Sequence, residues 1–151
     1  MVADTGIPSE TRSAVSDVGR LLKENPNKYR PLITELGNIS REIRTQLETN
    51  PDLKLIGAEM NKAQNLLEQL TVSDTSLEKL IRVALENGAL GAKLTGGGRG
   101  GCMVSLVADS SQAEKVAEAL QIAGAAEAWI FTIGEGNHES NSDSSHEYST
   151  H

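Results

Sequence analysis

Five glycines lie within the six positions 96 to 101, and Arg99 is the one interruption. Glycine loses more backbone freedom on folding than any other residue, so such a run is destabilising unless the backbone needs positive φ or a close approach to another group. Successive N–H groups exposed in a glycine turn form a concave nest that binds anions. The stretch therefore indicates a phosphate-binding loop, and its alternative is a flexible hairpin loop without a ligand.

Two well-known phosphate motifs do not fit this loop. The spacing Gly96-x-Gly98-x-x-Gly101 matches the dinucleotide-binding fingerprint, which requires a helix directly after the glycines. Here the following residues 103–107 read Met-Val-Ser-Leu-Val, which is a strand pattern. A Walker-A loop would end in Gly-Lys-Ser or Gly-Lys-Thr, and the sequence Gly101-Cys102 does not supply that ending. Both motifs are therefore rejected on context.

Neither imidazole nor thiol chemistry is expected from this chain. All three histidines lie beyond residue 133, so residues 1–133 offer no imidazole as a general base, triad member or zinc ligand. The single cysteine, Cys102, begins an apolar run and is expected to be a small core residue rather than a nucleophile. One cysteine excludes an internal disulfide and fits a reducing compartment. We therefore expect a cytoplasmic protein without a metal site.

The charge balance argues against nucleic acid and membrane partners. The formal net charge is −7 and no basic cluster is present, whereas surfaces that bind nucleic acid or anionic lipid are basic. No apolar run approaches the ~20 residues that a membrane-spanning helix needs. A chain of 151 residues fits one domain. Because aromatic residues are scarce, its core must come from Leu, Ile, Val and Ala.

Periodicity and capping residues divide the chain into helices and strands. Apolar residues at helical spacing predict helices, and short runs rich in β-branched residues predict strands. The expected N-caps are Ser9, Ser76 and either Ser110 or Ser111, and Pro31 suits a first helical turn. The expected elements are a strand at 2–5, helices at 10–24, 31–49, 52–70 and 76–87, strands at 91–95 and 102–108, a helix at 110–123 and a strand at 128–133.

This order of elements predicts an α+β fold. When the helical insertion after the first strand is collapsed, the order becomes β-α-β-β-α-β, a ferredoxin-like antiparallel sheet with a multi-helix insertion on one face. We expect residues 1–133 to form this domain. Residues 134–151 consist mostly of polar and charged types with almost nothing apolar. They are expected to form a disordered polar tail.

The glycine stretch resembles a known signature when its flanks are included. Residues 91–102, Gly-Ala-Lys-Leu-Thr-Gly-Gly-Gly-Arg-Gly-Gly-Cys, are similar to the third, C-terminal signature of the kinase superfamily that includes galactokinase, homoserine kinase, mevalonate kinase and phosphomevalonate kinase. The match looks closest to the mevalonate kinases, because Lys-Leu-Thr precedes the glycines. The resemblance runs from about residue 2 to residue 133. Further matching stretches are 4–7, Thr11, 60–61, 65–67, 70–73 and 128–130.

The resemblance covers only half of such a kinase. These enzymes have two halves, and their main phosphate loop, catalytic lysine and catalytic aspartate belong to the N-terminal half, which has no counterpart in this sequence. We therefore expect a kinase C-terminal domain that is a fragment, a split gene product or an engineered half. No catalytic residue is assigned to it, Asp4 included, and it is expected to be inactive alone. The implied partner is the N-terminal half, and bare apolar faces predict self-association, for example as a homodimer.

The activity implied by the resemblance is ATP- and magnesium-dependent phosphorylation of the 5-hydroxyl of mevalonate, a step of isoprenoid biosynthesis. ATP and Mg²⁺ would bind mainly through the missing N-terminal half. Thr11 would lie near the substrate. Ser9 stands where some relatives carry a basic residue. Arg99 could add a positive charge to the site, but a solvated side chain is the expected arrangement. The nucleotide- and phosphate-proximal loop would be Thr95, Gly96, Gly97, Gly98, Arg99, Gly100 and Gly101.

Two other functions stay open at this point. One is another kinase of the same superfamily, either galactokinase-like or phosphomevalonate kinase-like. The other is a non-enzymatic ferredoxin-like module that uses the glycine nest to bind a small anion. The role of Thr95 is open as well, because its hydroxyl could contribute to a site or the residue could merely close the strand.

Overall fold

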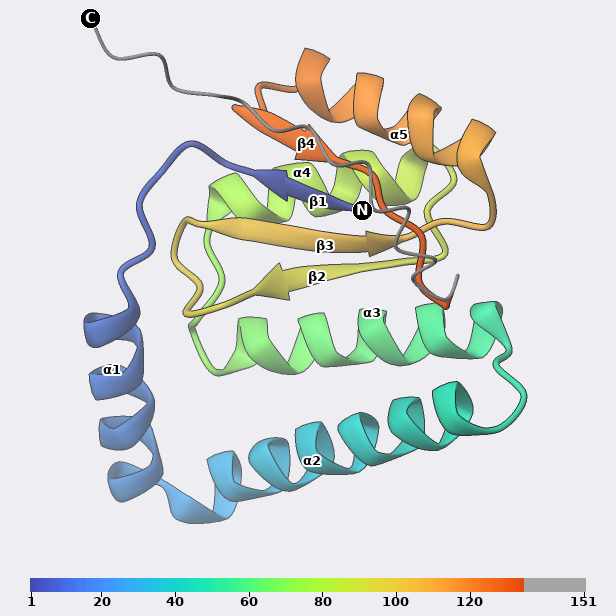
Figure 1. The fold of residues 1–151 in the computed structure, drawn as a ribbon. Helices are drawn as coiled ribbons and strands as arrows, with labels where there is room; N and C mark the ends of the chain where they lie inside the picture. The colour runs from blue at the N-terminus through green and yellow to red at the C-terminus, as the bar shows by residue number, and fades with distance from the viewer. Residues whose placement is uncertain (135–151) are drawn as a thin grey trace, which may run out of the picture.

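A computed structural model of the chain describes residues 1–134, so all of the expected polar tail except Gly134 lies outside the described residues. Within this range a small sheet is combined with five helices (Figure 1). In chain order the elements are β1 (Val2–Asp4), α1 (Thr11–Glu24), α2 (Pro26–Glu48), α3 (Leu53–Gln69), α4 (Thr75–Glu86), β2 (Gly91–Thr95), β3 (Cys102–Leu106), α5 (Ser110–Ile122) and β4 (Glu127–Trp129).

The four strands form one sheet in the order β2-β3-β1-β4, and every neighbouring pair is antiparallel. Its register pairs Ala3 with Met103 and Met103 with Leu94. These three side chains are buried on one face because side chains alternate along a strand. Helices α4 and α5 cover that face and complete the core. The expected combination of helices with an antiparallel sheet is confirmed.

Helix α3 lies along the free edge of β2. The side-chain amide of Asn61 accepts a hydrogen bond from Ala92 N at 3.0 Å and donates to Leu90 O at 3.3 Å. The buried Gln64 accepts from Leu94 N at 2.9 Å. These side chains thus supply partners for backbone groups that an edge strand would otherwise leave unpaired. The helix thereby holds the strand that leads into the glycine loop.

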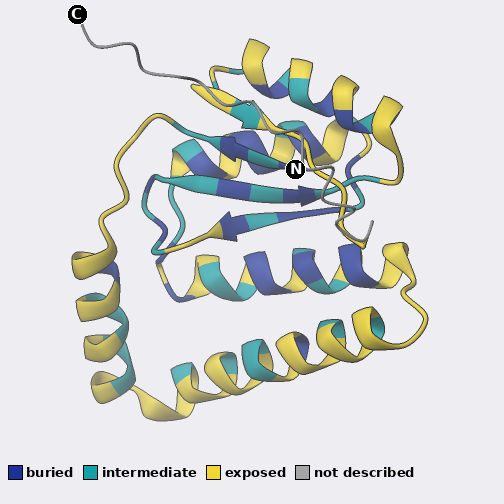
Figure 2. Cartoon of the chain, in the orientation of Figure 1, coloured by how far each residue is buried: buried dark blue, intermediate teal, exposed yellow. Residues whose placement is uncertain are grey.

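Helices α1 and α2 extend away from the sheet and are mostly exposed, as the yellow colouring in Figure 2 shows. Helix α2 packs along α3, and α1 contacts α2. Helix α2 begins at Pro26, five residues earlier than expected from Pro31, which lies inside the helix. The reason is local: Asn25 accepts a hydrogen bond from Lys28 N, and Pro26 fits the first helical position.

The serine caps expected for α4 and α5 are wrong. Asp74 caps α4 by accepting from Leu77 N at 2.9 Å, and Asp109 caps α5 by accepting from Gln112 N at 2.8 Å. Ser76 instead lies within α4, and Ser110 and Ser111 lie within α5. An aspartate accepts this bond with a full negative charge, which the positive end of the helix dipole favours further.

The last strand is shorter than expected from its apolar run. β4 ends at Trp129 because its partner β1 offers only three residues, with Val2 opposite Trp129. Residues 130–133 therefore have no strand beside them, and Ile130, Phe131 and Ile133 are exposed. β3 likewise ends at Leu106 rather than Ala108.

Candidate functional site

The glycine loop connects β2 to β3 and packs against residues 7–11 and Val72, which are far from it in sequence. A Cβ atom on Gly97 would overlap the Thr11 side chain, and one on Gly98 would overlap the carbonyl oxygen of Val72. The backbone therefore approaches its neighbours at distances that only glycine permits. This packing brings Thr11 and the loop, two predicted parts of the site, into direct contact.

One end of the loop is tied down and the other is open. Arg99 N donates to Val72 O at 2.9 Å, and Gly101 N donates to Ile7 O at 2.7 Å. Within residues 1–134, no hydrogen bond uses the N–H groups of Gly96, Gly97, Gly98 or Gly100, but Gly98 and Gly100 are buried whereas Gly96 is exposed and Gly97 half-buried. A Cβ on Gly96 would also meet nothing within 4 Å. The expected anion nest thus fits the first two glycines rather than the whole loop.

Ser9 forms a hydrogen bond with the glycine loop and does not cap α1. Its Oγ donates to Gly98 O at 2.6 Å and lies 3.3 Å from Thr11 Oγ1. The N-cap of α1 is Glu10, whose side chain makes no capping bond. The expected cap at Ser9 is therefore wrong, because the hydroxyl is used in a tertiary contact. This contact holds the Thr11 hydroxyl beside the loop.

Arg99 is not solvated as expected. Its side chain is 21% exposed and forms an ion pair with Asp17 of α1, at 2.7 Å between Nη1 and Oδ2. Its guanidinium also donates to Thr71 O at 3.0 Å and to Ser13 Oγ at 3.3 Å. The Arg99 guanidinium, with a smaller contribution from Arg20, lowers the pKa of Asp17. The positive charge is thus neutralised within the chain instead of facing solvent.

Three residues of this arrangement were missed from the sequence. Ser13 and Asp17 lie one turn apart on α1 and face Arg99, and Thr71 lies in the connection between α3 and α4. The spacing of Ser13 and Asp17 places two polar groups on one helix face, which is a weak signal available from sequence. Thr71 has a φ of 66°, and a threonine in the sequence does not predict this left-handed backbone conformation.

The polar residues of the strands beside the loop are less suited to a role in the site. Thr95 is exposed at the end of β2, opposite Cys102. Cys102 is half-buried rather than a core residue, and partial burial together with Asp4 raises the pKa of its thiol, which disfavours the thiolate. Lys93 donates to Leu94 O at 2.6 Å, and burial lowers its pKa. Asp4 accepts from Gly6 N at 2.9 Å and so stabilises the turn after β1.

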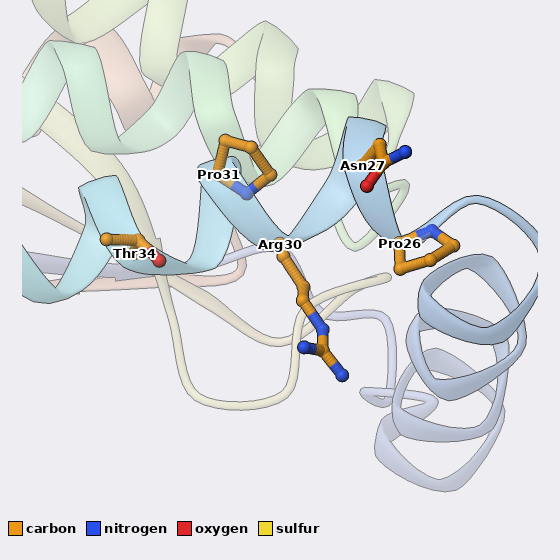
Figure 3. Close-up of a pocket in the computed structure, with 5 residues that line it drawn as sticks. All are labelled: Pro26, Asn27, Arg30, Pro31 and Thr34. Carbon is orange, nitrogen blue, oxygen red and sulfur yellow. The ribbon is translucent and has the colours of Figure 1, made fainter.

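A shallow surface hollow lies elsewhere, at the corner between α1 and α2 (Figure 3). No residue of the glycine loop lines it; its lining consists of Pro26, Asn27, Arg30, Pro31 and Thr34.

Residues 1–134 contain no group of three or more His, Cys, Asp or Glu side chains that could hold a metal ion. None of the helices in this range is long and apolar enough to cross a membrane.

The chain is similar in sequence to mevalonate kinases. Against the mevalonate kinase of Thermococcus sibiricus it is 38% identical over 128 residues, which cover 82% of this chain and 38% of the relative. Against that of Pyrococcus furiosus it is 36% identical with the same coverage. The chain therefore spans about 38% of the length of these curated relatives.

Solved structures agree with these relatives. The L. major mevalonate kinase, solved in complex with R-mevalonate, matches with a TM-score of 0.76 and 35% identity over 80% of this chain and 37% of that one. The Lin0012 protein of Listeria innocua also reaches a TM-score of 0.76, at 23% identity, and so shows the fold alone. The family model described as GHMP kinases C terminal matches residues 39–126, a span that contains α3, β2 and the glycine loop. The chain therefore belongs to the GHMP kinase family, in which it corresponds to the C-terminal domain.

Proposed function

We propose that this chain is the C-terminal part of an ATP-dependent mevalonate kinase, which phosphorylates the 5-hydroxyl of mevalonate in isoprenoid biosynthesis. The observation that carries the proposal is the contact between Thr11 and Gly97, which joins the substrate-proximal and phosphate-proximal parts of the chain. The mevalonate kinases among its relatives support the choice of substrate over other members of the family.

In this proposal the glycine loop forms a wall of the nucleotide site. ATP supplies the phosphoryl group and Mg²⁺ neutralises the charge of its phosphates. The unused N–H groups of Gly96 and Gly97 would donate to phosphate oxygens, and the small glycines let the backbone come close enough to do so. The remaining loop residues, from Gly98 to Gly101, hold these two amides in place through residues 7–11 and Val72.

Thr11 is proposed to face the substrate. It is the first residue of α1, and its hydroxyl lies beside both Ser9 and Gly97. A hydroxyl at a helix start can donate to an anionic or hydroxylated ligand while the helix dipole favours negative charge there. Thr95, exposed at the end of β2, is the other hydroxyl of the proposed site.

The proposal requires a second half. The main phosphate loop, the catalytic residues and the ligands of Mg²⁺ are assigned to an N-terminal half, so the chain alone would not turn over.

We also propose that residues 1–133 are the domain unit, that this domain works in the cytoplasm, and that its sheet is of the ferredoxin-like type. The strand order β2-β3-β1-β4 with helices on one face supports the last point.

The proposal is tested by reconstitution. The chain is mixed with an N-terminal half taken from the Thermococcus sibiricus relative, and ADP release is measured with mevalonate, phosphomevalonate or galactose as acceptor. We expect ADP release with mevalonate as acceptor and not with phosphomevalonate or galactose. A preference for galactose or phosphomevalonate would assign another specificity of the family. Tight binding of ATP or mevalonate by the chain alone, without turnover in any mixture, would favour the binding module.

A matched pair of variants tests the role of Thr11. Thr11→Val keeps the shape of the side chain but removes its hydroxyl, and we expect it to raise KM for mevalonate. Thr11→Ser keeps the hydroxyl and should stay near the unsubstituted enzyme. Equal kinetics for Thr11→Val and the unsubstituted enzyme would remove Thr11 from the substrate site.

A further inference from the structure

Arg99 is the one loop residue between Gly96 and Gly101 that has a side chain, and it has an uncommon backbone conformation. Its φ is 51°, in the left-handed region that non-glycine residues avoid. Thr71, with which it forms hydrogen bonds, has a φ of 66°. Two strained non-glycine residues in contact persist only where the surrounding structure holds them in place. The contacts of Arg99 identify what holds them.

Arg99 joins three separate parts of the chain. Its side chain reaches α1 through Asp17 at 2.7 Å and Ser13 at 3.3 Å, and it reaches the α3–α4 connection through Thr71 at 3.0 Å. Its backbone repeats the same pattern. Arg99 N donates to Val72 O at 2.9 Å, and Arg99 O accepts from Glu10 N at 3.2 Å, directly before Thr11. Side chain and backbone therefore tie the loop to the same two neighbours.

We infer that Arg99 is a positioning residue that clasps α1 to the glycine loop and so sets the distance between the Thr11 hydroxyl and the free N–H groups of Gly96 and Gly97. Helix α1 otherwise buries little surface, since Ala14 is its only fully buried residue and Val18 packs only partly against the core. Without the Arg99 side chain, the start of α1 would keep only the bonds of Ser9 Oγ to Gly98 O and of Glu10 N to Arg99 O, and the turn that carries Ser13 and Asp17 would no longer be held against the loop. The catalytic consequence rests on the proposed function, whereas the clasp itself does not.

The clasp is tested first in the chain alone, by hydrogen exchange at single amides. Arg99→Gly removes the side chain but suits the positive φ, and Asp17→Asn removes the charge with little change of shape. Each variant should speed exchange in the loop and in the first turns of α1 by a factor of about ten, the scale of one charge-assisted hydrogen bond. Exchange in β1 and β3 should not change.

Arg20→Ala is the matched control, because Arg20 also pairs with Asp17, at 3.7 Å, but does not touch the loop. It should leave exchange in the loop unchanged. Arg99→Lys, which keeps the charge but loses the fork of donors, should restore part of the protection. Unchanged exchange in both Arg99→Gly and Asp17→Asn would overturn the inference. A uniform rise over the whole chain would overturn it too, because Arg99 would then act only on global stability.

The second test uses the reconstituted kinase. Arg99→Gly and Asp17→Asn should each lower kcat for mevalonate about tenfold, and the double variant should be no worse than either single one because both remove the same contact. Fully additive losses would contradict the inference. If the unsubstituted mixture shows no turnover, the proposed function fails while the exchange result still decides the clasp.

Discussion

Gly97 shows how a single residue determines the geometry of the site. Its φ lies outside the left-handed region, so the demand for glycine comes from the Thr11 side chain against it and not from the backbone. Gly96 is the reverse case, with a φ of 79° and open space around it. The two adjacent glycines are therefore needed for different physical reasons.

This contrast predicts different costs for two alanine substitutions. Gly97→Ala should destabilise the chain by about 2 kcal/mol through overlap with Thr11, whereas Gly96→Ala should cost about 1 kcal/mol for its backbone conformation. Adding Thr11→Ala should recover part of the loss in Gly97→Ala and nothing in Gly96→Ala. Urea unfolding of the unsubstituted chain, the three single variants and the two double variants measures all of these values. Independent, additive effects of Gly97→Ala and Thr11→Ala would show that the two residues do not touch.

The lowered pKa of Asp17 predicts a pH dependence of stability. The folded chain favours the ionised carboxylate because Arg99 and Arg20 lie beside it. Its contribution is therefore present above the unfolded pKa of about 3.9 and is lost as the pH falls through the lower folded value. The difference in urea midpoint between the unsubstituted chain and Asp17→Asn should shrink below about pH 4. A difference that stays constant from pH 3 to pH 7 would contradict this assignment.

At the scale of elements, α3 acts as a substitute neighbour for β2. Asn61→Ala would leave Ala92 N without its partner, and Gln64→Ala would do the same to Leu94 N. Each should destabilise the chain by about 1–3 kcal/mol, the cost of an unsatisfied buried group. Asn65→Ala is the control, because Asn65 is exposed on the same helix and only accepts from Gln69. Equal urea midpoints for all three variants would refute this role of α3.

How far the sequence predicts these elements depends on where their determinants lie. Helix α3 and strand β2 were predicted closely, because an apolar stripe and a short apolar run are local patterns. The end of β4 was not, because it depends on the length of β1, more than a hundred positions away. In the site, the glycine loop and Thr11 are visible in the sequence, whereas the contacts of Ser9 and Arg99 are tertiary and could not be predicted.

At the scale of the whole molecule, one face of the sheet is poorly covered, and so are the residues at the end of β4. Helices cover the face that carries Ala3 and Met103, while no helix of the described residues covers the other face (Figure 1). Trp129, Ile130 and Phe131 expose about half of their surface. Such exposed apolar surface marks a place where another protein surface packs.

We therefore expect the isolated chain to self-associate and a matching N-terminal half to suppress this. Sedimentation velocity across a range of concentrations would show a rising average mass for the chain alone, and one species of the summed mass for the mixture. Phe131→Ser should weaken self-association, and Arg44→Ser, at an exposed ion pair of α2, should not. A monomer at every concentration would contradict the expectation.

The central proposal, that the chain is the C-terminal part of a mevalonate kinase, is tested most directly by ADP release with ATP, Mg²⁺ and mevalonate, measured for the chain alone and after addition of an N-terminal half. The account predicts no mevalonate-dependent ADP release from the chain alone and clear release from the mixture. Turnover by the purified chain alone would contradict it, because this chain would then have to contain the catalytic groups that are assigned here to the N-terminal half.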